Sequence, residues 1–231
     1  MIGLIPGPPP SGDLITESAG SMLTLSDVQT IVQQAVTTAN TTRAAIRLPN
    51  GSSARMAIAV SDLNGNILAL NLMPDVTIFS ADVAVAKARN MVYFSSAGSV
   101  DLPGVPSGTA VTNRTISFGA QPMYPPGVDG SAAGPFFSLY QLDTASPCTQ
   151  GTQPPNPNQS GVVFFPGAVP LYKNGVLVGG LGISGDGVDQ DDFVANGGAT
   201  GFMAPDNIRA DQVVIRGARL PYLLFPRNPT L

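Results

Sequence analysis

The densest group of side chains that could bind a metal lies at 186–192, where four carboxylates fall within seven residues. These are Asp186, Asp189, Asp191 and Asp192. Oxygen ligands of this kind suit Ca²⁺, although the spacing differs from that of an EF-hand loop. Acidic residues in the first turn of a helix also complement the helix dipole. The pattern therefore predicts either a metal site involving Asp186, Asp189 and Asp191 or a helix start.

A second group of charged side chains lies in the segment SADVAVAKAR (80–89). Lys87 and Arg89 could pair with a carboxylate or with an anionic ligand. They could equally be surface charges of a helix, paired with Asp82 or with solvent. The residues alone favour neither interpretation.

The chain contains no histidine and a single cysteine, Cys148. This excludes Ser-His-Asp and Cys-His catalysis, together with histidine-based zinc and iron sites. Cys148 can form no internal disulfide, and no histidine is present to activate its thiol. A carboxylate- or lysine-based enzyme remains open, but no motif points to one.

Three glycines, Gly180, Gly182 and Gly185, match the dinucleotide-binding pattern G-x-G-x-x-G. That function requires the glycines to follow a strand and open a helix. Here they fall inside a predicted strand, so we expect them to allow close packing of a helix or another subunit. Asp62, just before the turn residues Asn64 and Gly65, is expected to accept backbone N–H groups.

Charged residues make up only 11% of the chain, aromatic residues 6%, and the net charge is −4. There is no Lys/Arg cluster, which argues against nucleic-acid binding and against an anionic membrane surface. No apolar stretch is long enough for membrane insertion. Low charge predicts either much buried surface or self-association.

The first 20 residues are rich in proline and glycine and lack the basic and apolar regions of a standard signal peptide. The remaining chain is rich in Ser, Thr, Asn and Gln and poor in Lys. That composition is typical of exported bacterial proteins, so an extracellular or periplasmic location is our expectation.

Apolar periodicity predicts a helix after Thr24, with Asp27 completing a capping box. A hairpin follows, with strands at 55–62 and 66–72, and a second helix begins near Ser80. Further strands are predicted at 162–165, 169–173, 176–184 and 212–216, with a short helix from Val188 to about Asn196.

These elements predict three parts: an extended leader (1–22), a domain (23–204) and an extended tail (205–231). Glycine and proline recur through 97–160, which we interpret as a long irregular insertion wrapping the domain or a neighbour. Antiparallel pairs without serial βαβ units indicate an α+β fold.

Four blocks of sequence resemble the GlcG/HbpS-like haem-binding family. They are LTLSDVQTIVQQAV (23–36), AIAVSDLNGNILAL (57–70), SADVAVAKAR (80–89) and GAVPLYKNGVLVGGLGISGDGVDQDD (167–192). The resemblance implies a profilin-like antiparallel sheet with helices packed on it, a homo-oligomer, and binding of haem or a related tetrapyrrole.

The resemblance also places Asp82, Lys87 and Arg89 near the family's ligand groove, followed by Asn90 where the family usually has Thr. Without histidine, a haem iron would need Met, Tyr, Cys, Lys or no protein ligand. The nearest candidates are Met73, Met91 and Tyr93, which could equally be core residues.

Three hypotheses follow. The first is a non-enzymatic ligand-binding module for haem or a tetrapyrrole. The second is a structural subunit that self-associates through its insertion and tails, with ligand binding lost. An enzyme of unassigned type is the third.

Overall fold

The structure is a computed structural model that describes residues 11–96 and 99–223. Its centre is a five-stranded sheet in the order β1-β3-β2-β5-β4, in which every neighbouring pair is antiparallel. The strands are β1 (Gly12–Ile15), β2 (Met56–Ser61), β3 (Ile67–Leu72), β4 (Ala168–Lys173) and β5 (Val176–Gly185). The α+β class predicted from the sequence is confirmed.

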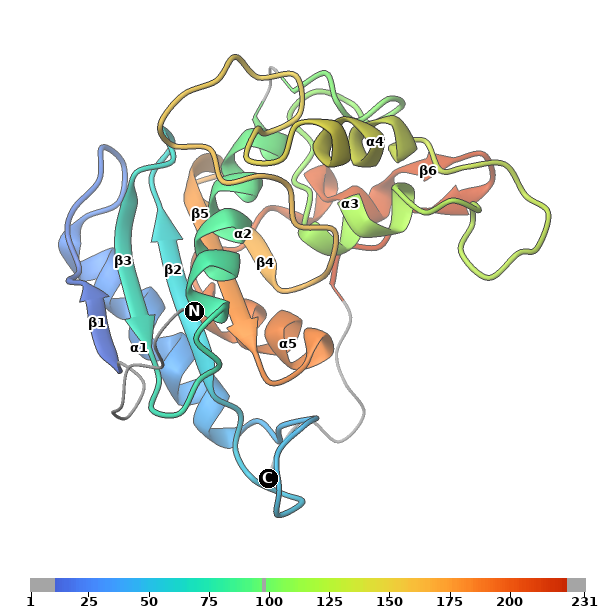
Figure 1. The fold of residues 1–231 in the computed structure, drawn as a ribbon. Helices are drawn as coiled ribbons and strands as arrows, with labels where there is room; N and C mark the ends of the chain where they lie inside the picture. Colours follow the sequence, from blue (N-terminus) through green and yellow to red (C-terminus); the bar gives the residue numbers. More distant parts are fainter. Residues whose placement is uncertain (1–10, 97–98, 224–231) are drawn as a thin grey trace, which may run out of the picture.

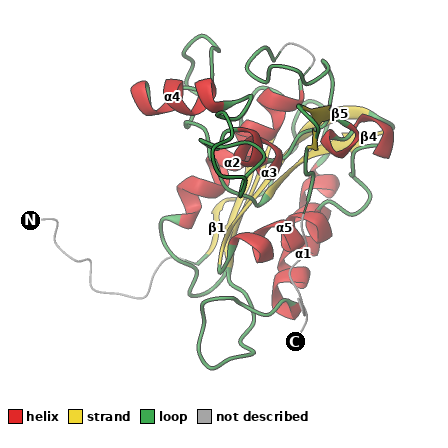
Figure 2. Cartoon of the chain, turned by 90° about the vertical axis from the view of Figure 1, so that its right-hand side faces the viewer, coloured by secondary structure: helices red, strands yellow, loops and turns green. Residues whose placement is uncertain are grey.

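Helices cover both faces of the sheet (Figures 1 and 2). Helices α1 (Leu25–Thr41) and α5 (Val188–Gly198) pack together on one face, and α2 (Ser80–Ser95) covers the other. Strand β2 is buried along its whole length. Its Ile58 and Val60 join the core beneath α1, whereas its Ala57 and Ala59 face α2.

Helix α1 forms as its sequence predicts. Thr24 Oγ1 accepts the backbone N–H of Asp27 at 3.2 Å, and Asp27 Oδ2 accepts the N–H of Thr24 at 2.7 Å. This capping box satisfies backbone donors that would otherwise lack partners at the helix start. The buried stripe is Val28, Ile31, Val32, Ala35 and Ala39.

The glycines of β5 let α2 lie directly against the sheet. A Cβ atom on Gly180 would stand 2.2 Å from the carbonyl oxygen of Ala88, and one on Gly182 would stand 2.1 Å from that of Ala84. Real contacts are never so short, so only glycine fits here. The expectation that these glycines allow close helix packing is confirmed. All three glycines lie within strand β5, so they do not form the turn between a strand and a helix that dinucleotide binding requires.

Within the predicted insertion, residues 99–160 are more ordered than expected. They contain α3 (Asn113–Gly119) and α4 (Phe137–Ala145) and build a second apolar core against α2, with Met91, Phe94, Ile116 and Phe136 at its centre. Helix α3 starts with its own capping box, formed by Thr112 and Thr115.

The prediction of a strand at 162–165 is wrong, because these residues form no strand in the structure. Side chains satisfy their backbone instead of a neighbouring strand: Asn90 Oδ1 accepts the N–H of Val163, and Asn113 Nδ2 donates to the carbonyl of Val163. In the leader, 12–15 form edge strand β1, and 1–10 lie outside the described residues.

The tail contains two short 3₁₀ turns (Asp206–Ile208 and Ala210–Gln212) and a small hairpin of β6 (Val214–Ile215) and β7 (Ala218–Arg219). Of the strand predicted at 212–216, only Val214 and Ile215 are in a strand. None of the helices in the described segments has the length and hydropathy that a membrane crossing requires.

Candidate functional site

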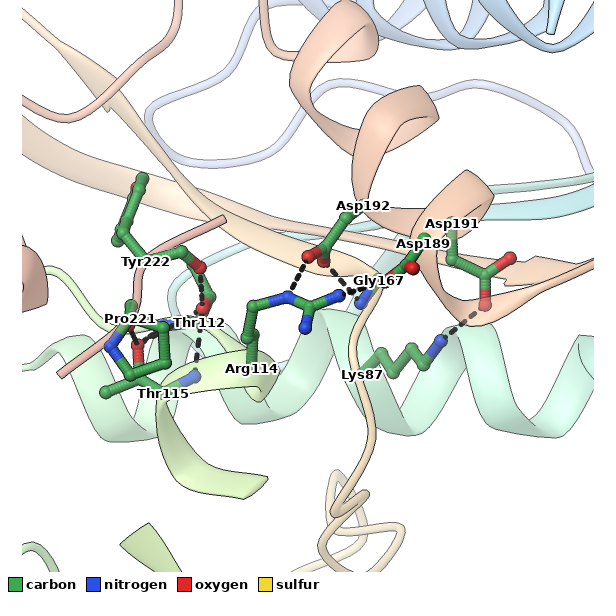
Figure 3. Close-up of polar contacts among 10 residues, drawn as sticks. All are labelled: Lys87, Thr112, Arg114, Thr115, Gly167, Asp189, Asp191, Asp192, Pro221 and Tyr222. Carbon is green, nitrogen blue, oxygen red and sulfur yellow. Dashed lines mark hydrogen bonds and ion pairs between the residues drawn. The ribbon is translucent and has the colours of Figure 1, made fainter. Parts of the chain in front are cut away.

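The four carboxylates at 186–192 do not come together around a common point. Asp186 pairs with Arg47 and accepts the backbone N–H of Arg55, whereas Asp191 pairs with Lys87. Asp189 and Asp192 both pair with Arg114 (Figure 3). Within residues 11–96 and 99–223, no three His, Cys, Asp or Glu side chains are grouped so as to hold a metal ion. The helix-start interpretation fits, since Asp189 and Asp191 lie in the first turn of α5.

Lys87 is completely buried between α2, β5 and α5. Its Nζ donates to the carbonyl of Ile183 at 2.7 Å and to Asp191 Oδ2 at 3.0 Å, and it lies 4.8 Å from the centre of the Phe165 ring. Burial lowers the pKa of Lys87 and raises that of Asp191 to about 6, with each partner opposing the other's shift. The prediction that Lys87 is a surface charge paired with Asp82 or solvent is wrong. Its partner is Asp191 of α5, which lies 104 residues further along the chain.

Arg114 joins α3 to the start of α5. Its Nε lies 2.5 Å from Asp192 Oδ2 and its Nη2 lies 2.5 Å from Asp189 Oδ1. Asp192 also accepts the N–H of Gly167 at 2.9 Å. This contact fixes the insertion to the helix that follows β5, and Figure 3 shows the guanidinium group turned toward Asp192 and Gly167.

Asn90 is a buried polar junction rather than a ligand-facing residue. Its Nδ2 donates to Gln150 Oε1 at 2.7 Å and to the carbonyl of Gly161 at 2.8 Å. Its Oδ1 accepts from Val163 N at 2.9 Å and from Asn113 Nδ2 at 3.3 Å. One side chain of α2 therefore holds three separate parts of the segment 113–163.

The remaining predicted residues are dispersed. Asp82 is exposed at the start of α2, and Met91 is buried in the core shared with the insertion. Met73 lies in the core on the opposite face of the sheet, and Tyr93 donates its hydroxyl to Asp101 at 2.5 Å. The structure thus does not bring Asp82, Lys87, Arg89, Asn90 and Met91 to one surface.

Arg89 lines a small polar cavity of about 310 Å³, which we call the Arg89 hollow. The β2–β3 turn, the second half of α2 and the end of the insertion enclose it. Its lining is Leu63, Asn64, Gly65, Arg89, Val92, Tyr93, Ser96, Gln150, Gln153, Asn156 and Asn158.

A larger cavity of about 560 Å³ lies beside α3, and we call it the α3 hollow. It combines apolar walls with two guanidinium groups, Arg114 and Arg219. Its lining is Arg114, Ser117, Phe118, Gln121, Pro126, Pro166, Val188, Asp211, Arg219, Pro221, Tyr222 and Leu223. The hydroxyl of Tyr222 is buried and has no hydrogen-bond partner in the described part of the chain.

The sequence did not single out the α3 hollow, because its walls come from the insertion and the tail. The buried amide of Asn113, the residue before Arg114, is bonded to the carbonyl of Val163. The sequence feature that could have drawn attention to this site is Arg114 itself, because charged residues are scarce in the insertion. Another hollow, between α1 and the β1–β3 edge, has polar and aliphatic walls, and its lining includes no aromatic side chain.

Comparison with known families settles the ancestry of this chain. The model of the family described as "Haem degrading protein HbpS-like" matches residues 23–200. The chain belongs to the HbpS-like family. Among the described residues, the match covers helices α1 to α5 and strands β2 to β5.

Similar proteins agree with this HbpS-like assignment. The corrinoid adenosyltransferase PduO of Citrobacter freundii is 29% identical over 154 residues, which are 67% of this chain and 34% of that protein. The HbpS-like chain therefore spans about a third of the length of this relative.

Two solved structures share the fold. A PduOC:heme complex superposes with a TM-score of 0.50 at 24% identity, covering 80% of this chain and 95% of that one. Protein ORFY of Klebsiella pneumoniae superposes with a TM-score of 0.51 at 20% identity, covering 82% and 97%.

Proposed function

We propose that this HbpS-like protein is a binding module for a tetrapyrrole, and that the α3 hollow receives it. The observation that carries the proposal is the pairing of apolar walls with two guanidinium groups in one cavity. A tetrapyrrole such as haem combines a flat apolar ring with carboxylate side chains. The cavity volume also falls within the range of small-molecule sites.

The two arginines differ in how much of their hydrogen-bonding capacity the protein uses. Asp189 and Asp192 hold Nη2 and Nε of Arg114. Arg219 is exposed and forms no ion pair with a carboxylate of the described residues. Asp211 also lines the cavity, but its ion pair is with Arg209. Arg219 is therefore the group that can hold a propionate, because a guanidinium binds a carboxylate through two parallel hydrogen bonds. Arg114 instead holds helix α3 against the start of α5, and both contribute to the lining of the α3 hollow.

A haem iron in this cavity would have Tyr222 as its candidate protein ligand. Met73 and Met91 do not line the cavity, and tyrosine binds haem iron in other proteins. Burial raises the pKa of Tyr222 well above its usual value, so the hydroxyl keeps its proton without a ligand. When bound, the haem would supply redox or oxygen chemistry, and the protein would bind and orient it.

The test is a titration of the full chain with haem and, separately, with metal-free protoporphyrin IX, followed by absorption spectroscopy. We expect one tetrapyrrole per chain in both cases. Arg219→Gln should weaken both by about tenfold, the effect of one charge-assisted hydrogen bond. Arg43→Gln, which removes an equal charge from the loop after α1, should bind like the parent protein.

The variant Tyr222→Phe distinguishes binding of the tetrapyrrole ring from coordination of the haem iron. It should leave metal-free protoporphyrin IX binding unchanged and shift the Soret band of the haem complex. Absorption spectra identical to those of the free tetrapyrroles would contradict the proposal.

A second function, self-association, is favoured by a set of exposed apolar side chains. Ile46 (68% exposed) and Leu48 (86%) lie on the loop after α1, and Ile78 (68%) and Phe79 (62%) precede α2. Arg47 joins the two loops through Asp75. We propose that this surface joins copies of the chain, in a homo-oligomer that also binds the tetrapyrrole.

Light scattering of the full chain tests the second function. The parent protein should have the mass of an oligomer, and Leu48→Ser with Phe79→Ser should reduce it. A monomer at high concentration would contradict the assembly role and would leave the tetrapyrrole proposal unaffected.

A further inference from the structure

Arg89 is a partly buried cation, and burial lowers its pKa with no carboxylate acting against that shift. The buried Lys87 has Asp191, and the partly buried Arg47, Arg114 and Arg209 each have two carboxylates. Arg89 forms no ion pair with any carboxylate in residues 11–96 or 99–223. A cation removed from water without a countercharge is costly, and such an arrangement in a cavity suggests a missing anion.

The guanidinium is held in place but not saturated. Nε donates to the carbonyl of Gly65 at 2.9 Å, and Nη1 donates to Ser160 Oγ at 2.5 Å. Arginine has five N–H donors, so three remain without an acceptor in the described part of the chain. These three belong to the two outer nitrogens, which form the fork that binds carboxylate or phosphate.

Two acidic residues that are bonded to lining residues of the hollow are already satisfied. Asp62 accepts from the backbone N–H groups of Asn64 and Asn66 and from Asn66 Nδ2, all within 2.9 Å. Asp101 accepts from the hydroxyl of Tyr93 at 2.5 Å and from Thr152 N at 3.0 Å. Neither neutralises Arg89.

The rest of the cavity lining is suited to a polar molecule. It includes five carboxamide side chains, from Asn64, Gln150, Gln153, Asn156 and Asn158, and the hydroxyl of Ser96. Carboxamides both donate and accept hydrogen bonds, so they suit a body that carries hydroxyl groups. The volume of about 310 Å³ lies at the lower end of the range for small-molecule sites.

We propose that the Arg89 hollow binds a small oxyanion, a carboxylate or phosphate carried on a hydroxyl-bearing body, through the outer N–H groups of Arg89. This site is separate from the α3 hollow, and it does not depend on tetrapyrrole binding. It couples the β2–β3 turn, α2 and the end of the insertion through one ligand.

Calorimetric titration of the full chain at low salt tests the proposal, with inorganic phosphate, glycerol 3-phosphate and malate as probes. At least one should bind, and the pattern separates phosphate from carboxylate recognition. Arg89→Gln should weaken binding by about tenfold to a hundredfold, the range for hydrogen bonds to a charged group. Arg43→Gln should bind like the parent protein.

Gln153→Glu provides a second variant that keeps the local hydrogen bonds. Gln153 Oε1 accepts from Gln150 at 3.3 Å and from Gln159 at 3.0 Å, and a glutamate oxygen can accept both. The new carboxylate supplies the missing countercharge, so we expect a higher melting temperature and loss of probe binding. This result does not require Arg89→Gln to fold.

Haem titration of Arg89→Gln distinguishes the two sites. Unchanged haem binding with lost probe binding supports separate sites. No binding of any probe by the parent protein, equal probe binding by Arg89→Gln, or loss of haem binding in Arg89→Gln would overturn the proposal.

Discussion

Lys87 Nζ and Asp191 Oδ2 lie 3.0 Å apart, and neither side chain has appreciable contact with solvent. The pair links α2 on one face of the sheet to the first turn of α5 on the other. Buried ion pairs of this kind contribute little net stability, because burial costs the charges their hydration. Removing one partner is a different matter, since the other charge is then left alone.

This relationship predicts non-additive effects of mutation. Lys87→Met should lower the free energy of unfolding by about 3–5 kcal/mol, because Asp191 remains buried without its cation. Combining it with Asp191→Leu should recover most of the loss. Urea unfolding of the parent, the two single variants and the double variant measures the coupling. A double variant as unstable as the sum of the single ones would contradict this account.

The same pair predicts a pH dependence. Burial raises the pKa of Asp191 to about 6 in the folded protein, against an ordinary value of 3.8. Between those values the folded state holds a proton that the unfolded chain has released. The contribution of Asp191 to stability is therefore fully present below about pH 4 and is lost as the pH rises to about 6.

Urea unfolding between pH 4 and 7 checks this sign. The difference in free energy of unfolding between the parent protein and the Lys87→Met/Asp191→Leu variant should fall by about 1.4 kcal/mol for each unit by which the pKa is raised. Subtraction removes the titration of the other carboxylates, which both proteins share. A difference that rises with pH in this window would show that Asp191 titrates below its ordinary value.

The contact between α2 and β5 predicts a strong effect of one methyl group. In Gly182→Ala the new Cβ would meet the carbonyl of Ala84, so α2 must move away from the sheet. We expect a loss of about 1–3 kcal/mol or more in thermal or urea unfolding. Gly20→Ala is the matched control, because its Cβ would first meet the flexible end of Leu68. Similar losses in both variants would contradict the argument.

Asn90 predicts a local rather than a global defect. Asn90→Leu keeps the volume but removes the partners of Gln150, Gly161 and Val163. Each buried group left without a partner costs about 1–3 kcal/mol. Hydrogen exchange should therefore accelerate at the amide of Val163 while the amides of β2 keep their protection. Equal acceleration in both places would mean that Asn90 supports the whole domain.

The elements that the sequence predicts correctly are those governed by local pattern. The capping box at Thr24 and Asp27, the stripe of α1 and the turn at Asn64-Gly65 depend on residues close together in the chain. The glycines of β5 were also interpreted correctly, because a strand with glycines implies close approach.

Prediction failed where distant side chains replace local structure. The apolar run at 162–165 has strand composition, yet Asn90 and Asn113 satisfy its backbone. Lys87 lies on the apolar side of α2 in the sequence pattern, but only the fold reveals that Asp191 is its partner. The two cavities escape sequence analysis for the same reason, since segments far apart in the chain form their walls.

The order β1-β3-β2-β5-β4 also determines when the sheet can be completed during synthesis. Strands β2 and β3 pair as a hairpin early, but the other edge of β2 pairs with β5, which begins only at Val176. Until the ribosome has released that stretch, a strand that is fully buried in the folded protein presents an open edge to other chains. Pairing across so long a separation is slow, so nascent chains of this protein should depend on chaperones that shield the hairpin.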